Sequence, residues 1–196
     1  MSGGTSAMVG VSTALLCSGA LAACGSGNSP THASFVRHDC GTPSATTPAA
    51  TTRHYVVLAM VERSQAMYTP AQVKAKHPKA GEVMLSGGSM GAGATGMAAA
   101  KSTRHLEVKI CSRRTGRVVS GHPKISLQDL SMSKAAARAV PAAAMKGIGE
   151  SGRDLHYGNN VPIVAGHDYA LAVRIGGERA VVRMRLRHGM PPVRIR

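Results

Sequence analysis

The sequence predicts an all-β protein: an immunoglobulin-like antiparallel β-sandwich with one short helix and a long flexible N-terminal segment. About seven short runs rich in β-branched and apolar residues are separated by turn-forming residues, without a regular alternation of strands and helices. The clearest run is 103–110, where Leu106, Val108 and Ile110 alternate with polar residues. A period of two is typical of a strand with one face in a core.

The other predicted strands are short and lie on both sides of this run. A buried strand is expected over 55–61, because the stretch is apolar and contains no Gly or Pro. Gly176 and Gly177 suit a tight hairpin turn between two strands. The remaining expected strands are 81–85 (a brief strand or turn), 117–120, 124–130, 161–164, 169–175 and 180–186.

A short helix is predicted over 66–78. Thr69 is a suitable N-cap, Pro70 suits the first helical position, and Pro78 should stop the helix. The alanine-rich stretch 134–144 contains Pro141, so a short helix or an irregular crossover is expected there.

The N-terminal region has the pattern of an export signal. Residues 1–23 carry no charged side chain, and the apolar run 14–23 is too short to span a bilayer. The stretch Leu-Ala-Ala-Cys-Gly at 21–25 resembles the lipobox of bacterial lipoproteins. The resemblance implies cleavage before Cys24, acylation of its thiol with a lipid such as palmitate, and a membrane anchor on the extracytoplasmic face.

These features divide the chain into four parts. Residues 1–23 are the predicted signal peptide, and 24–53, rich in Gly, Ser, Pro, Thr and Ala, are a lipidated flexible linker. The β-sandwich domain is expected over 54–187, and 188–196 should be a loose C-terminal tail. Cys40 and Cys111 remain in the exported chain and could form a disulfide in an oxidising compartment, or stay unpaired.

The composition limits the choice of partner. The chain has 24 Lys and Arg against nine Asp and Glu, a formal net charge of +15, which favours anionic partners. Trp is absent, and the few Tyr and Phe are not interleaved with the basic clusters, so nucleic acid is not an expected partner. No enzyme is predicted, because the Gly-x-Ser-x-Gly pattern at 87–91 lacks the strand and helix that a nucleophile elbow requires.

Two stretches contain side chains suited to metal binding. In the strand 103–110, His105 and Glu107 leave the same face, roughly 7 Å apart along the backbone, near enough to converge on one ion. His156 and Tyr157 begin a stretch, 156–161, whose Gly and two Asn predict a tight loop before a strand. The structural alternative is an exposed polar strand face for the first pair, with His156 exposed and Tyr157 packed at a corner.

Together, the sequences His-Leu-Glu at 105–107 and His-Tyr-Gly-Asn-Asn-Val at 156–161 resemble the periplasmic copper-binding accessory proteins of bacterial iron uptake. That family has an immunoglobulin-like domain, and its Met-bearing segment corresponds to 140–145 here. The resemblance implies the metal ligands His105, Glu107, Met145 and His156, with Met84 as a possible additional ligand. His167 and His188 are candidates for a further histidine of the family, although neither lies in a matching motif.

The ligand set that the resemblance implies favours copper, because imidazole and carboxylate suit the cupric ion and a thioether suits the cuprous ion. Iron is an alternative cargo. The expected function is a membrane-tethered, extracytoplasmic metal-binding lipoprotein, an accessory to metal or iron uptake, with a metal permease and a second copy of the chain as potential partners. The alternative is a non-metal structural or interaction lipoprotein of the cell envelope that binds anionic polymers through its basic surface.

Overall fold

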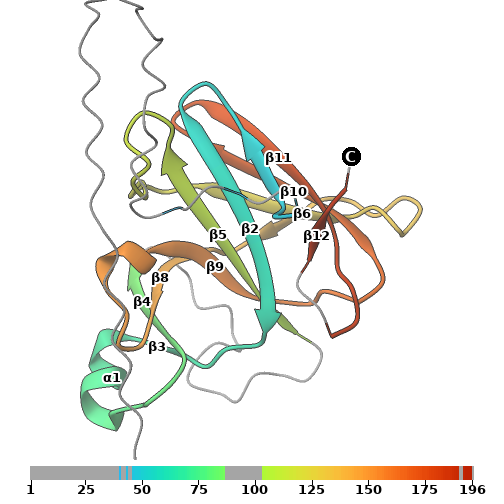
Figure 1. Ribbon diagram of the computed structural model, residues 1–196. Helices are drawn as coiled ribbons and strands as arrows, with labels where there is room; N and C mark the ends of the chain where they lie inside the picture. The colour runs from blue at the N-terminus through green and yellow to red at the C-terminus, as the bar shows by residue number, and fades with distance from the viewer. Residues whose placement is uncertain (1–39, 41–42, 44–45, 87–102, 190–191, 196) are drawn as a thin grey trace, which may run out of the picture. The chain divides into compact units, whose positions relative to one another are not determined.

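The computed structural model describes residues 40, 43, 46–86, 103–189 and 192–195, and these form two β-sheets and one α-helix (Figure 1). The larger sheet contains, in spatial order, β1 (Ala49–Thr51), β2 (Tyr55–Arg63), β5 (Arg104–Ser112), β9 (His156–Val161), β8 (Ala143–Gly147), β4 (Glu82–Ser86) and β3 (Met67–Tyr68). The smaller contains β12 (Val193–Arg194), β11 (Glu178–Arg185), β10 (Asp168–Ile175), β6 (Lys124–Asp129) and β7 (Arg138–Val140). The predicted all-β sandwich with a short helix is confirmed.

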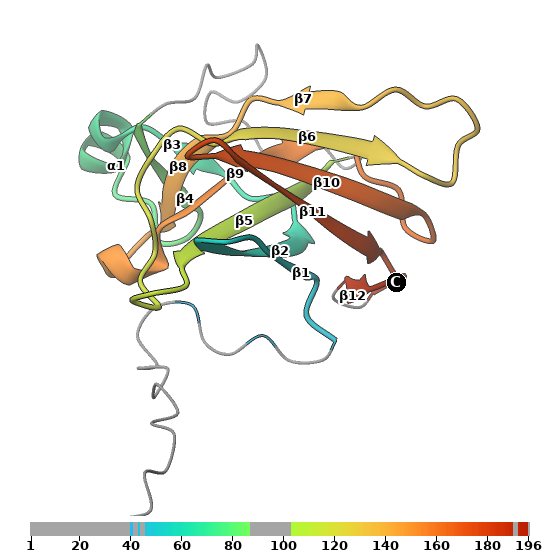
Figure 2. The same cartoon turned by 90° about the horizontal axis from the view of Figure 1, so that it is seen from above.

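The main core lies between the two sheets, which Figure 2 shows as two layers. In β5 the predicted alternation holds: Leu106, Val108 and Ile110 are fully buried in this core. On the smaller sheet, β10 contributes Leu171 and Val173 to the same core. The apolar faces of the two sheets therefore cover each other, as the period-two pattern predicts.

The helix α1 (Pro70–Lys76) begins where the sequence predicts its start signals. The hydroxyl of Thr69 accepts a hydrogen bond from the amide of Gln72, and the Gln72 side chain accepts one from the Thr69 amide. This reciprocal pair is a capping box. The helix ends at His77, which adopts a left-handed conformation (φ 47°) immediately before Pro78.

Three local predictions are corrected by the structure. The predicted helix 66–78 starts too early, because Met67 and Tyr68 form β3, which pairs in parallel with β4. The stretch 134–144 forms no helix; Pro141 and Ala142 separate β7 from β8. The predicted strand at 117–120 is reduced to a single bridge between Val118 and Cys111.

The predicted hairpin between the last long strands is present. Gly176 and Gly177 both have positive φ, 54° and 80°, which is typical of a two-residue turn that joins tightly paired strands.

The sandwich extends beyond both of its predicted boundaries. Strand β1 lies inside the predicted linker and pairs with β2 over Val56, Val57 and Leu58. Strand β12 lies inside the predicted loose tail and pairs with β11. Short strands with few large apolar residues have too little periodicity to be recognised, and tertiary pairing determines them.

The predicted signal peptide and the predicted acylation site, Cys24, lie outside the described residues. Among the described residues, no helix is long and apolar enough to cross a membrane.

Candidate metal centre

Two histidines and two glutamates meet on the face of the larger sheet that points away from the main core. In β5, His105 and Glu107 alternate with the core residues Leu106 and Val108, so they leave the opposite face. In β9, His156 alternates with the core residue Tyr157 in the same way. The stretch 156–161 is therefore a strand and not the predicted loop.

Strand pairing brings these side chains together from distant parts of the sequence. β5 pairs with β9, with Glu107 opposite Gly158 and His105 opposite Asn160. The rings of His105 and His156 lie edge to face with centroids 5.9 Å apart. Both side chains are almost completely buried, with 1% of their surface exposed.

Glu82 of β4 completes the centre, and the sequence analysis did not identify it. Its Oε2 lies 3.5 Å from Nε2 of His156, although β8 separates β4 from β9 in the sheet. One ligand atom each from Glu82, His105 and His156 can be chosen within 4.8 Å of one another, a spacing compatible with a shared metal ion. No motif marks Glu82, because its position depends on the folding of a separate strand.

The hydrogen bonds of the two imidazoles fix which ring nitrogen can bind a metal. Nδ1 of His156 lies 2.9 Å from the carbonyl oxygen of Asp154, so Nδ1 carries the proton and donates. Nδ1 of His105 lies 3.3 Å from Oδ1 of Asn160, an oxygen that also accepts from the amide of Gln65. In the neutral form of each ring the lone pair therefore lies on Nε2, the arrangement that outer hydrogen bonds impose on metal-binding histidines.

Four polar atoms at this centre are buried without a hydrogen-bond partner: Oε2 of Glu82, Nε2 of His105, Oε1 of Glu107 and Nε2 of His156. Leaving a buried polar atom unsatisfied costs about 1–3 kcal/mol. Three of the four belong to Glu82, His105 and His156, whose ligand atoms are close enough to share one cation, and the fourth belongs to Glu107, which is not in that group. These unsatisfied atoms make the cluster a candidate metal centre.

Burial also shifts the pKa values of three side chains at the centre. Desolvation, followed by the neighbouring His156, lowers the pKa of His105 from 6.5 to about 4, so its imidazole is neutral at pH 7. Desolvation raises the pKa of Glu82 from 4.5 to about 7, although His156 acts in the opposite direction. Burial likewise raises the pKa of Glu107. These shifts reflect the cost of holding carboxylates here without a cation.

Glu107 lies on the other side of the His156 ring. Its Oε1 is 3.9 Å from Nδ1 of His156, and it forms a second group of closely spaced ligand atoms with Asp154 and His156. Because Nδ1 donates to the Asp154 carbonyl, this second group is less suited to a metal than the group around Nε2. The carboxylate best placed for a first ligand is therefore that of Glu82, with Glu107 beside it.

Methionines border the centre. Met145 of β8 is fully buried and stands directly opposite His156 in the β8–β9 pairing. Met84 of β4 stands opposite Met145, and both pack with Met67 and Ala143 in a small apolar cluster separate from the main core. Directly opposed residues have Cβ atoms about 5 Å apart, so the Met145 thioether is a neighbour of the His156 ring.

Other predicted residues lie elsewhere. His167 is hydrogen-bonded through Nδ1 to Asp129 at 2.7 Å, and His188 is exposed; neither belongs to a group with metal-ligand spacing in the described part of the chain. Cys40 and Cys111 are joined as a disulfide, with Cα atoms 6.3 Å apart.

Comparisons with protein-family models, curated protein sequences and solved structures give no match to this chain.

Proposed function

We propose that this protein binds a transition metal ion, most favourably copper, at a centre formed by His105, His156 and Glu82, with Glu107 and Met145 beside them. The supporting observation is that Glu82, His105 and His156, whose ligand atoms lie within 4.8 Å of one another, each carry a buried polar atom without a hydrogen-bond partner. Two neutral imidazoles and a carboxylate are a common ligand set for first-row divalent metals.

Copper is favoured by the sulfur atoms around the centre. Thioethers add affinity for the cuprous ion and contribute little to zinc, magnesium or calcium. Met145 stands opposite His156 in the sheet and packs in one small apolar cluster with Met67 and Met84. Iron stays an alternative cargo, because imidazole and carboxylate also bind the ferrous ion.

In the wider proposal, the protein is an exported lipoprotein that is tethered through Cys24 and supplies metal to an uptake system. Support comes from the lipobox-like stretch at 21–25 and from the linker-like composition that follows it. Binding and transfer of an ion need no catalytic residue, so no enzymatic activity is proposed.

Titration of the metal-free domain with cuprous, cupric, zinc and ferrous ions tests the proposal. We expect one tight copper site per chain in the wild type, lost in both His105→Ala and His156→Ala. His122→Ala is the matched control, because His122 is exposed and outside the centre. The proposal is wrong if the correctly folded His105→Ala and His156→Ala proteins bind copper as tightly as the control.

One observation favours the alternative of an interaction protein for anionic polymers. Lys124, Arg174 and Arg179 stand directly opposite one another across β6, β10 and β11, where like charges repel. Polymer binding without metal binding, lost in Arg174→Gln and Arg179→Gln, would support this alternative.

A further inference from the structure

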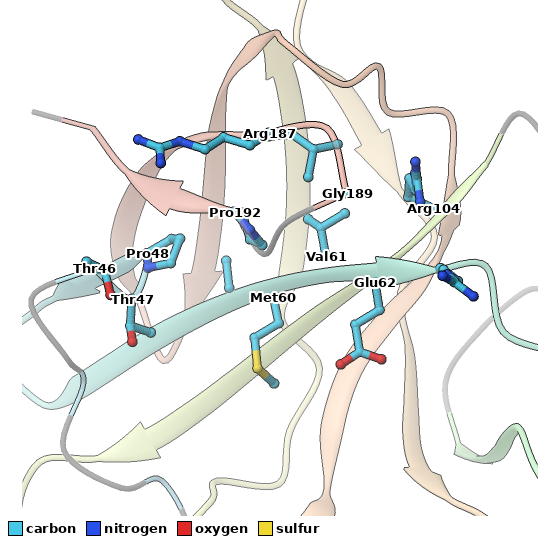
Figure 3. A pocket seen from close by; sticks show the side chains of 13 residues that line it. Thr46, Thr47, Pro48, Met60, Val61, Glu62, Arg104, Arg187, Gly189 and Pro192 are labelled. Carbon is cyan, nitrogen blue, oxygen red and sulfur yellow. The ribbon is translucent and has the colours of Figure 1, made fainter.

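A cavity of about 460 Å³ lies beside β2, at the place where β1 stops pairing with it (Figure 3). This volume falls within the usual range for ligand pockets. Arg63, Arg104 and Arg187 are among its lining residues, together with apolar residues that include Val61 and Pro192. No residue of the metal centre lines it.

The cavity lies beside the part of β2 that extends beyond its pairing with β1. The amide of Ala59 donates to the carbonyl of Pro48 at 3.0 Å, so the odd-numbered residues of β2 direct their main-chain groups towards β1. Before Pro48 the chain leaves β2: the carbonyl of Thr46 accepts from the amide of Arg194 in β12. Val61 therefore continues this edge with no strand of the described residues beside it.

Val61 and Arg63 both line the cavity, and within the described residues their N–H and C=O groups on the β1 side have no hydrogen-bond partner. Unpaired main-chain groups along a strand edge are a template for another extended chain. The short free edge suits a peptide segment of a few residues.

The charges around this edge determine what kind of peptide fits. Arg63 and Arg104 are directly opposite in the β2–β5 pairing, and like charges in that position repel. Neither of them, nor Arg187, is paired with a carboxylate among the described residues. Glu62 is the one acidic lining residue, and its side chain points to the other face of β2, away from Arg187 and Pro192 (Figure 3). An acidic side chain in the cavity would remove the repulsion.

The charge of the chain argues against a segment of the same protein, or a second copy of it, as the occupant of the cavity. Outside the described residues the sequence contains one acidic residue, Asp39, so those segments offer little complement to three guanidinium groups. A second copy is disfavoured by the net charge of +15 on each chain.

We propose that the free edge of β2 at Val61 and Arg63 binds an extended acidic peptide segment of a partner protein by strand addition. Main-chain hydrogen bonds to Val61 and Arg63 hold the segment, carboxylates face the three arginines, and apolar side chains contact Leu186 and Pro192.

The test uses the exported chain without residues 1–23, kept metal-free, and a labelled pentapeptide of alternating Glu and Val. Its binding is followed by fluorescence anisotropy and by the amide signals of Val61 and Arg63 in NMR spectra. We expect both amides to shift and to gain protection from hydrogen exchange. Arg63→Gln and Arg104→Gln should each raise Kd about tenfold, the usual effect of losing a charge-assisted contact.

Three controls make the outcome decisive. Arg179→Gln removes one charge from the opposite sheet and should leave Kd unchanged. If Arg179→Gln weakened peptide binding as much as Arg63→Gln does, the peptide would be attracted to basic surfaces in general, and the proposal would be overturned. A pentapeptide with methylated main-chain nitrogens should bind about tenfold more weakly. Equal binding of the methylated peptide would show a site for carboxylates alone, and would overturn strand addition. A peptide with Gln in place of Glu should not bind measurably, and binding as tight as that of the parent peptide would contradict the role of the arginines.

Discussion

At the scale of single residues, the candidate centre combines ionisable side chains whose charged forms are destabilised by burial. His105 is kept neutral, and Glu82 is held in a position where its ionised form is disfavoured. Three of the four atoms that lack hydrogen-bond partners belong to Glu82, His105 and His156, whose ligand atoms lie within 4.8 Å of one another. A bound cation would stabilise the ionised carboxylates and occupy the free imidazole lone pairs.

The role of sulfur is tested by Met145→Leu, a change of similar volume. We expect cuprous affinity to fall about tenfold or more, because the soft ligand is lost, while zinc affinity changes little. The control is Met184→Leu, which alters a methionine of the main core at 1% exposure. Competition titrations against a cuprous chelator and a zinc chelator measure both affinities. Equal cuprous affinity in the two variants would show that Met145 is not a ligand of the cuprous ion.

The raised pKa of Glu82 predicts a pH dependence of stability in the metal-free protein. Its pKa is about 7 in the folded state and 4.5 in the reference state, so the folded protein binds more protons between these values. Its contribution to stability is complete below pH 4.5 and is lost as pH rises through 7. His105 acts in the opposite sense, since its lowered pKa costs stability as pH falls from 6.5 towards 4.

Glu82→Gln isolates the carboxylate, because glutamine stays neutral and His105 is present in both proteins. The stability of the variant relative to the wild type should increase by at most about 3 kcal/mol between pH 4.5 and pH 8. Urea unfolding with a metal chelator present measures this difference. A difference that does not vary with pH would contradict the shifted pKa.

At the scale of elements, the close pairing of β5 and β9 positions the centre. A Cβ at Gly158 would lie 1.9 Å from the carbonyl oxygen of Leu106, so the two strands approach closely only because this residue is glycine. Gly158 stands opposite Glu107, between His156 and Asn160 on β9. Any separation of the strands here would move both imidazoles.

Gly158→Ala should therefore destabilise the domain by about 2–3 kcal/mol and weaken metal binding as well. Gly152→Ala is the control, since a Cβ there has no neighbour within 4 Å. Chemical unfolding and copper titration of both variants provide the comparison. Wild-type stability in Gly158→Ala would show that the strands can separate without cost.

The sequence predicted the elements whose signals are local. Strand β5 is identifiable from its alternation, and α1 from Thr69, Pro70 and Pro78. Strand β9 was not recognised, because Gly158 and its two neighbouring asparagines favour turns in isolation. Tertiary pairing with β5 and β8 overrides that preference.

At the scale of the whole molecule, the two faces of the larger sheet have different roles. One face closes the main core against the smaller sheet, and the other carries the small methionine cluster and the candidate centre. Strand alternation and the resemblance of motifs placed His105, Glu107 and His156 among the candidate ligands. It could not reveal Glu82, because only the folded arrangement of β4, β8 and β9 brings that residue within 3.5 Å of His156.

The Cys40–Cys111 disulfide joins positions 71 residues apart and so closes a long loop of the unfolded chain. In the chain-entropy description, a loop of this length stabilises the folded state by about 4 kcal/mol. Cys40→Ser should lower the free energy of unfolding by a similar amount, and a reducing agent should affect the wild type but not this variant. Identical unfolding curves for oxidised and reduced wild type would contradict a stabilising disulfide.

X-ray absorption spectroscopy of the copper-loaded protein would identify the ligands of the proposed centre. We expect two imidazole ligands in the cupric form, with an oxygen ligand, and a sulfur contribution after reduction that Met145→Leu abolishes. His105→Ala and His156→Ala should each remove one imidazole contribution. A copper environment without imidazole, or one that neither substitution changes, would contradict a metal centre at this position.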